Sequence, residues 1–267
     1  MFQFALSGFR SGLRGRSFQA VFALGLVLVG VAYLSGFFSP RQPRTVALDV
    51  GLSGLRFSLV LLNLFWMQEL IAKEIDRRTI LFSLAYPVPR SAFLLGRFIS
   101  MLGLSTIAAL AMALALWLAV LVAGGGYEQE FAVALGLPYW ATVFGLLVDA
   151  AVVGAFALWM STLSTVAVLP FILGAAFALG GKALGPVLDY LQRGADGDVA
   201  LESRYRPLLE AVQWALPDLS RLDWRHWPMY GQDPGAATMG WALLLAVSYI
   251  GIILLLAVAG FRRREFS

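Results

Sequence analysis

Long apolar blocks separated by short polar stretches dominate this 267-residue sequence and limit what it can fold into. A block such as Phe18–Phe38 has no amphipathic striping, and a helix of that length crosses a hydrocarbon core of about 30 Å. Charged residues make up 13% of the chain, about half the fraction usual in soluble domains. The sequence therefore predicts an all-α polytopic membrane protein with a single transmembrane domain over residues 1–267.

Six blocks are expected to form transmembrane helices. They cover residues 18–38, 54–72, 91–123, 138–162, 165–187 and 238–260. The third block is longer than a hydrocarbon core of about 30 Å requires, so its first turns are expected to protrude from the membrane. Residues 188–237 form the one sizeable polar loop, in which we expect an interfacial helix with aromatic anchors.

Residues 1–16 carry an amphipathic pattern. One helical face holds the apolar side chains and the opposite side is basic, with Phe2, Leu6, Phe9 and Leu13 on the first and Arg10 and Arg14 on the second. A helix with this pattern lies in the plane of the membrane interface. An N-terminal interfacial helix is therefore predicted before the first span.

Basic residues in the short polar stretches gather on one side of the predicted membrane. They are Arg10, Arg14, Arg16, Lys73, Arg77, Arg78, Arg90, Arg97, Arg262, Arg263 and Arg264. The positive-inside rule then places both termini in the cytoplasm, and residues 188–237 on the outer side. The preference for arginine over lysine is typical of a GC-rich bacterial genome, so we expect a multi-pass protein of the bacterial cytoplasmic (inner) membrane.

Motifs for independent catalysis are missing from the sequence. The chain has no cysteine and a single histidine, His226, so thiolate and histidine-cluster metal sites are not expected. The run Gly180-Gly181-Lys182-Ala183 lacks the spacing and the hydroxyl residue of a phosphate-binding loop, and we interpret its small residues as a helix-packing feature. We therefore expect no enzyme and no cofactor bound by this chain. Its net charge of +4 needs no nucleic-acid partner, because basic residues flank the spans.

Ionisable residues inside the predicted spans are candidate functional residues, because each is costly in hydrocarbon unless paired or hydrated. Asp149 lies near the middle of the fourth span, either lining a translocation path or dimer interface or pairing with a neighbouring helix. Glu69 is a second candidate for the path or interface, although an ion pair with Lys73 four residues later also explains it. Arg56 is expected to snorkel to the outer surface.

A charged segment, residues 73–90, connects the second and third spans. It begins Lys73-Glu74-Ile75-Asp76-Arg77-Arg78-Thr79 and ends Pro87-Val88-Pro89-Arg90. Hydrocarbon does not tolerate such a cluster, so the segment must lie outside the bilayer. It is interpreted either as a short surface helix that a soluble partner can grip, ended by Pro87, or as a basic loop that only sets the topology.

This segment resembles the one that links the second and third spans in the ABC-2 permease family. The resemblance rests on Glu74, on Thr79-Ile80 and Leu84, on Pro87-Val88-Pro89-Arg90 and on Leu95-Gly96-Arg97-Phe98. Two positions depart from the family pattern: Arg78 stands where glycine is usual and Pro89 where serine is usual. The amphipathic start, the six spans and the basic C-terminal end are similar as well.

The resemblance implies the permease subunit of an ATP-binding-cassette transporter, an exporter that dimerises and is driven by a separate ATPase subunit, which holds the ATP and Mg. It implies that the residues contacting the ATPase are Glu74, Asp76, Arg77, Arg78, Thr79, Pro87 and Arg90. Two alternatives remain open. One is a scaffold or envelope-assembly factor that recruits an outer-compartment protein through residues 188–237, and the other is an ion-coupled carrier that uses Asp149.

Overall fold

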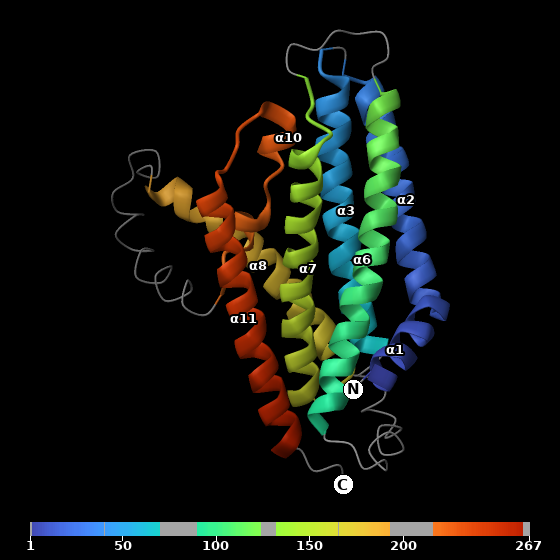
Figure 1. The fold of residues 1–267 in the computed structure, drawn as a ribbon, viewed down its shortest axis with the longest axis vertical. Helices are drawn as coiled ribbons and strands as arrows, with labels where there is room; N and C mark the ends of the chain where they lie inside the picture. Colours follow the sequence, from blue (N-terminus) through green and yellow to red (C-terminus); the bar gives the residue numbers. More distant parts are fainter. Residues whose placement is uncertain are drawn as a thin grey trace.

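Helices account for nearly all of the backbone that the structure describes. The computed structural model describes residues 2–39, 41–69, 90–123, 132–164, 166–192 and 216–263, and these ranges contain no strand. The helices are α1 (Phe2–Arg14), α2 (Arg16–Phe37), α3 (Pro43–Met67), α6 (Arg90–Val122), α7 (Leu137–Leu163), α8 (Leu169–Gln192), η3 (Leu219–Leu222), α10 (His226–Tyr230) and α11 (Ala236–Arg263). The long helices form an elongated bundle (Figure 1). The all-α prediction is confirmed for this part of the chain.

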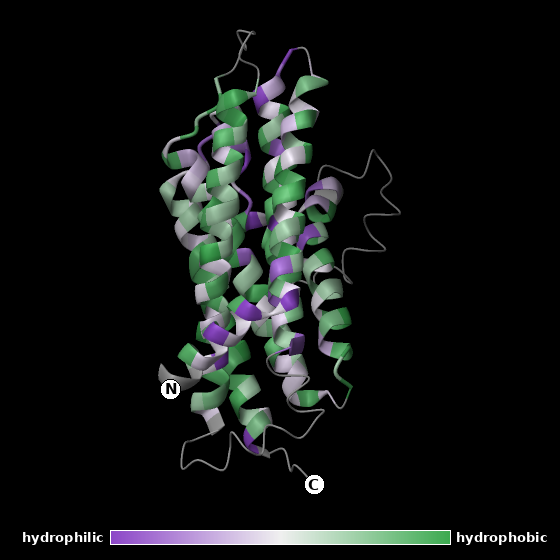
Figure 2. Ribbon diagram, turned by 90° about the vertical axis from the view of Figure 1, so that its right-hand side faces the viewer, coloured by the Kyte–Doolittle hydropathy of each residue, from purple (hydrophilic) through white to green (hydrophobic). Residues whose placement is uncertain are grey.

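Six of these helices, α2, α3, α6, α7, α8 and α11, are long and apolar enough to cross a membrane. Apolar residues predominate along the length of the bundle (Figure 2). Exposed side chains such as Leu34, Leu179 and Leu255 would be unfavourable in water but suit contact with lipid. The chain is therefore a multi-pass membrane protein by the length and composition of its helices.

The helix bounds agree with the predicted spans to within about five residues, with one exception. Helix α3 begins at Pro43, whereas the second span was expected from residue 54. Pro40, Arg41, Pro43 and Arg44 indicate a polar connection in the sequence, but the helix already includes the last two of them. Ala47 and Leu48 are fully buried in the bundle, so the helix is kept as one piece. Pro43 fits the first turn, where a missing N–H costs nothing.

Helices α2 and α3 pack closely through small residues. A Cβ atom at Gly36 would come within 2.8 Å of the Pro43 carbonyl oxygen, and one at Gly54 within 2.9 Å of the Leu28 Cβ. Lipid is as apolar as the protein interior, so helices in a membrane associate mainly through such close van der Waals contact. The glycines therefore fix how near α3 lies to α2.

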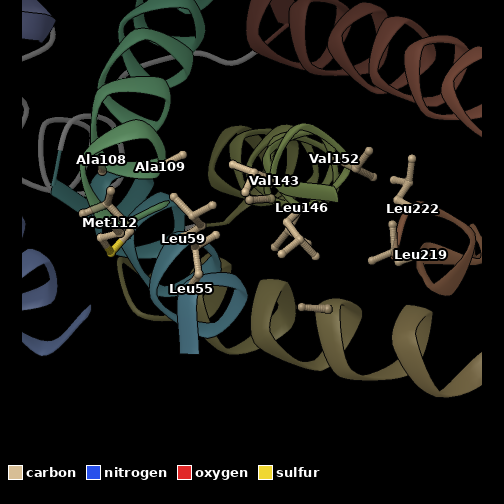
Figure 3. Close-up of a cluster of buried hydrophobic side chains, with 14 of the residues drawn as sticks. Leu55, Leu59, Ala108, Ala109, Met112, Val143, Leu146, Val152, Leu219 and Leu222 are labelled. Carbon is tan, nitrogen blue, oxygen red and sulfur yellow. The ribbon is translucent and has the colours of Figure 1, made fainter. Parts of the chain in front are cut away.

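Helix α7 is the most buried helix of the bundle and packs against α3, α6, α8 and α11. Its side chains Val143, Leu146 and Val152 lie between Leu55 and Leu59 of α3 on one side and Leu219 and Leu222 on the other (Figure 3). Alanine and glycine fill much of its length, which lets four neighbours approach. The centre of the fold is thus α7, and α3 is held directly against it.

Helix α1 lies across the first turns of α6, at the same end of the bundle as the last turn of α11 (Figure 1). Ser100 Oγ donates a hydrogen bond to the Ala5 carbonyl oxygen at 2.7 Å, and Gly8 and Gly12 face α6. Leu6 and Leu13 of α1 remain exposed. A helix is therefore present where an interfacial one was predicted; its position in a membrane interface stays a prediction, as does the cytoplasmic location of both termini.

A loop segment, residues 216–235, packs against α7 and α8. Thr142 Oγ1 donates to the Trp224 carbonyl oxygen at 3.1 Å, and Ala134 N donates to the Pro228 carbonyl oxygen at 2.9 Å. A Cβ atom at Gly145 would overlap the Leu222 carbonyl oxygen. Glycine on α7 therefore lets the backbone of the loop segment touch the helix.

Replacing Gly145 with alanine is expected to destabilise the protein by about 1–3 kcal/mol, because the added Cβ must displace backbone rather than a flexible side chain. The measurement is the free energy of unfolding in mixed micelles. Gly251→Ala in α11 is the matched control, since a Cβ there meets nothing within 4 Å, and it should leave stability unchanged or slightly raised. Equal effects of the two substitutions would contradict this packing.

Candidate functional site

A cavity of about 530 Å³ lies between α3, α8 and the loop segment. Its walls come from all three: Ser53, Arg56, Phe57, Val60, Leu61 and Leu64 of α3, Ala175, Ala178, Leu179 and Lys182 of α8, and Asp223 and Arg225 of the loop segment. The charged residues lie toward one end and the apolar residues toward the other. This cavity is the candidate functional site.

Arg225 connects the loop segment to α3 at the charged end. Its Nη1 donates to Asp49 Oδ1 at 2.8 Å and to Ser53 Oγ at 2.7 Å, and its Nε donates to both oxygens of Asp223 at 2.9 and 3.0 Å. Hydrogen bonds between charged groups are stronger than neutral ones. Arg225 therefore holds α3 and the loop segment in a fixed relation at the charged end of the cavity.

Lys182 of α8 forms an ion pair with the same carboxylate, Asp223. Gly181 and Gly185 flank the lysine, and a Cβ atom at Gly181 would come within 2.8 Å of Leu219 Cδ1. The small residues here do allow close packing, as the sequence suggested, but their neighbour is η3 rather than another membrane span. Lys182 itself lines the cavity. In the sequence it stands out only within a run that lacks the pattern of a phosphate-binding loop.

Arg56 and Asp149 form an ion pair near the midpoints of α3 and α7. Asp149 is only 1% exposed, and Asp149 Oδ1 and Arg56 Nη2 are buried without a hydrogen-bond partner in the described part of the chain. Of the two interpretations of Asp149, the structure supports pairing with a neighbouring helix. The expectation that Arg56 snorkels to the outer surface was wrong, because a carboxylate within the bundle binds its guanidinium.

A polar stripe runs along one face of α3. Asp49, Ser53, Arg56 and Asn63 follow each other at intervals of four, three and seven residues, which is helical spacing. Asn63 is fully buried, donates to the Ala150 carbonyl oxygen at 2.8 Å and accepts from Ser105 Oγ of α6. Sequence reasoning did not link Asp49, Ser53 and Asn63 to Arg56. The shared face was the signal that could have linked them.

The remaining predicted site residues lie away from the cavity or outside the described part of the chain. Glu69, at the end of α3, accepts a hydrogen bond from Ser17 Oγ at 2.6 Å. It is 13 residues from Arg56, which corresponds to about 20 Å of helix, so the structure does not bring Glu69 and Asp149 together. Arg90 opens α6. The other predicted coupling residues lie outside the described residues, and so does Lys73; they are Glu74, Asp76, Arg77, Arg78, Thr79 and Pro87.

The loop segment carries charged groups whose pKa values respond to each other. Burial alone would raise the pKa of Asp223, but Arg225 and Lys182 outweigh it and hold that pKa below its ordinary value. Burial would lower the pKa of Arg225, but Asp223 and Asp49 outweigh it and raise that pKa. Both groups are therefore charged at neutral pH.

The charged side chains that line the cavity are Arg56, Lys182, Arg225 and one carboxylate, Asp223. Within the ranges that the structure describes, no three His, Asp or Glu side chains gather as metal ligands would. His226 is exposed and stacks on Tyr230 with ring centroids 5.8 Å apart, as expected for a surface histidine. What the site offers a ligand is cationic hydrogen-bond donors at one end and an apolar wall at the other.

Comparison with models of known protein families gives no match. No match is found among curated proteins either.

Replacing Arg56 with leucine is expected to destabilise the protein by about 3–5 kcal/mol, because Asp149 is left charged and unpaired inside the bundle. Replacing both residues with leucine should restore most of this loss. The measurement is again the free energy of unfolding in mixed micelles. Arg221→Leu is the control, since Arg221 pairs with Asp218 at 3.1 Å but is 62% exposed, and its loss should cost less than about 1 kcal/mol.

The contribution of Asp223 to stability is expected to disappear on acidification. Its pKa is lowered by folding, so the stabilisation is present above the unfolded-state pKa, about 4, and is lost as the pH falls through the lower folded-state value. The measurement is the unfolding midpoint of the wild type and of Asp223→Asn from neutral pH downward. The two midpoints should converge in acid, and a difference independent of pH would contradict the assignment.

Proposed function

We propose that this chain is the transmembrane permease subunit of an ATP-binding-cassette transporter in the bacterial cytoplasmic membrane. A separate ATPase subunit binds and hydrolyses ATP with Mg, and it docks on the charged segment, residues 73–90. The six apolar helices and the resemblance of residues 74–98 to ABC-2 permeases support this function. A second copy of the chain and export of the substrate are part of the same proposal, and both rest on the resemblance.

One observation carries the proposal: a single helix, α3, connects the cavity to the charged segment. Six residues of α3 line the cavity, and the helix ends at Met67, shortly before residue 73. On the other side of the segment α6 begins at Arg90, and Ser105 of α6 donates a hydrogen bond to Asn63 of α3. A displacement of the segment would therefore move the two helices together and change the cavity.

The motif residues in α6 have a packing role that suits such coupling. Arg97 is only 7% exposed and its guanidinium lies over the Phe93 ring, 5.3 Å from the centroid. Phe93 stacks on Phe261 of α11 with centroids 6.2 Å apart. The first turns of α6 are thus packed against both α1 and the end of α11. Force applied at residues 73–90 would reach three helices rather than one loop.

The pairing of Asp149 bears on the ion-coupled alternative. A carboxylate that carries a proton or sodium ion must exchange its counter-charge during each cycle. Asp149 already has Arg56 as a partner within the bundle and is almost completely buried. This arrangement favours a structural role for Asp149 over a carrier role.

Purification of the tagged chain from its native host in a gentle detergent is expected to retain an ATP-binding-cassette ATPase subunit. Asp76→Ala combined with Arg77→Ala should reduce the retained ATPase by about tenfold or more, because charge-assisted contacts at the docking segment are lost. The measurement is the amount of ATPase per permease by quantitative mass spectrometry.

The matched control removes one cation and one anion from the loop segment instead, by Arg221→Ala with Asp233→Ala. That variant should keep the ATPase, and both variants should insert into the membrane at the wild-type level. Absence of any ATPase from the wild-type preparation, or its full retention by the Asp76/Arg77 variant, would contradict the proposal. Copurification of an outer-compartment protein alone would instead favour the scaffold.

A further inference from the structure

The cavity between α3 and α8 separates polar from apolar walls along its length. The stretch of α3 that lines it, Ser53 to Leu64, spans about 16 Å. Ser53 and Arg56 mark the polar end, where Lys182 and Arg225 also lie, and Leu64 marks the apolar end. A ligand that fills it needs a polar group on one end and an apolar body on the other. We propose that the cavity binds an anionic lipid, with its phosphate at the cationic end and an acyl chain along the apolar wall.

The mouth of the cavity faces the apolar exterior of the bundle. Phe57 and Leu179 line it, and they are 54% and 73% exposed although they lie well inside two helices long enough to span the membrane. Exposed apolar side chains at such positions contact lipid. A ligand can therefore enter sideways from the bilayer without its chain crossing water.

The side chains that line the polar end offer a ligand more hydrogen-bond donors than acceptors. Three cations line the cavity, Arg56, Lys182 and Arg225, against one carboxylate, Asp223. Asp149 and Asp49, which pair with two of the cations, are not part of the lining. The three cations and the three carboxylates balance overall, but cationic hydrogen-bond donors predominate on the lined surface, and such donors suit an anionic acceptor.

The cations also have hydrogen-bond donors to spare. Arg56 Nη2 is buried without a partner in the described part of the chain, and the ammonium group of Lys182, which has three donors, pairs there with Asp223. Arg56 Nη2 has almost no accessible surface, so a phosphate oxygen would meet the remaining donors of Lys182, whose side chain is 30% exposed. A phosphate group therefore complements this end in hydrogen bonding.

A free phosphate would leave most of the cavity empty. Val60, Leu61, Leu64, Ala175 and Ala178 provide a wall with no polar side chain, and water there would lack hydrogen-bond partners. An acyl chain fills such a space and buries apolar surface on both sides. This inference is independent of the proposed ATPase, because the site lies entirely within this chain.

The test uses the full-length chain, delipidated in a non-ionic detergent and titrated with phosphatidylglycerol, with binding followed by native mass spectrometry. Phosphatidylcholine of the same chain length tests the charge, and inorganic phosphate as a competitor tests the head group alone. Phosphatidylglycerol is expected to bind about tenfold or more tightly than phosphatidylcholine, and phosphate at millimolar concentration should not displace it.

Two variants test the two ends separately. Lys182→Gln should weaken phosphatidylglycerol binding about tenfold, whereas Lys182→Arg, which keeps the charge, should largely retain it. Ala178→Phe should fill the space for the acyl chain beside the apolar wall and leave every charged residue in place. Its control is Ala237→Phe, on an exposed face of α11. Unfolding midpoints without lipid show whether each variant is folded.

Equal binding of the two lipids would overturn the proposal, as would unchanged binding by a folded Ala178→Phe variant. Displacement of phosphatidylglycerol by inorganic phosphate would also overturn it, because the site would then recognise a small anion. Loss of binding in Lys182→Gln and Ala178→Phe, with both controls intact, would establish that head group and chain occupy this cavity.

Discussion

The pairing of Arg56 with Asp149 is the interaction on which the arrangement of this bundle depends. Hydrocarbon offers no partner to a charge, so a charged side chain near the middle of a span must find one inside the protein. Arg56 lies on α3 and Asp149 on α7, and their ion pair fixes which face of α3 turns toward the central helix. Of the remaining polar residues of that face, Asn63 bonds to α6 and α7, and Asp49 and Ser53 bond to the loop segment.

The loop segment completes this arrangement by bringing charges to α3 and α8. Asp223 binds Lys182 and Arg225, and Arg225 reaches Asp49 and Ser53 on α3. These contacts require the backbone of the segment to lie against α7 and α8, which is possible because glycines at 145, 181 and 185 leave no side chain in the way. Close approach and charge pairing therefore depend on each other at this end of the fold.

The spans could be predicted from the sequence because the length of an apolar block is set by the thickness of the membrane. The start of α3 could not, since Arg41 and Arg44 look like residues of a polar connection, whereas in the structure α2 packs closely along the first turns of this helix. Asp149 was identified from its cost in hydrocarbon, but its partner was not, because Arg56 is 93 residues away and pairing across helices leaves no local pattern. The role of Lys182 depended on the loop segment for the same reason. The contact of residues between 73 and 90 with an ATPase subunit stays a prediction.

A ligand in the cavity would act on the same contacts that the proposed ATPase subunit would move. Arg56 is attached to α3, Lys182 to α8 and Arg225 to the loop segment, so a phosphate that bridges them holds these elements at one separation. Movement of α3 relative to α8 would then have to break that bridge. A ligand that binds one arrangement better than another shifts the equilibrium toward it, and the arrangement in turn sets the affinity for the ligand. The position of α3 and the occupancy of the cavity would thereby be linked, whatever substrate the proposed transporter carries.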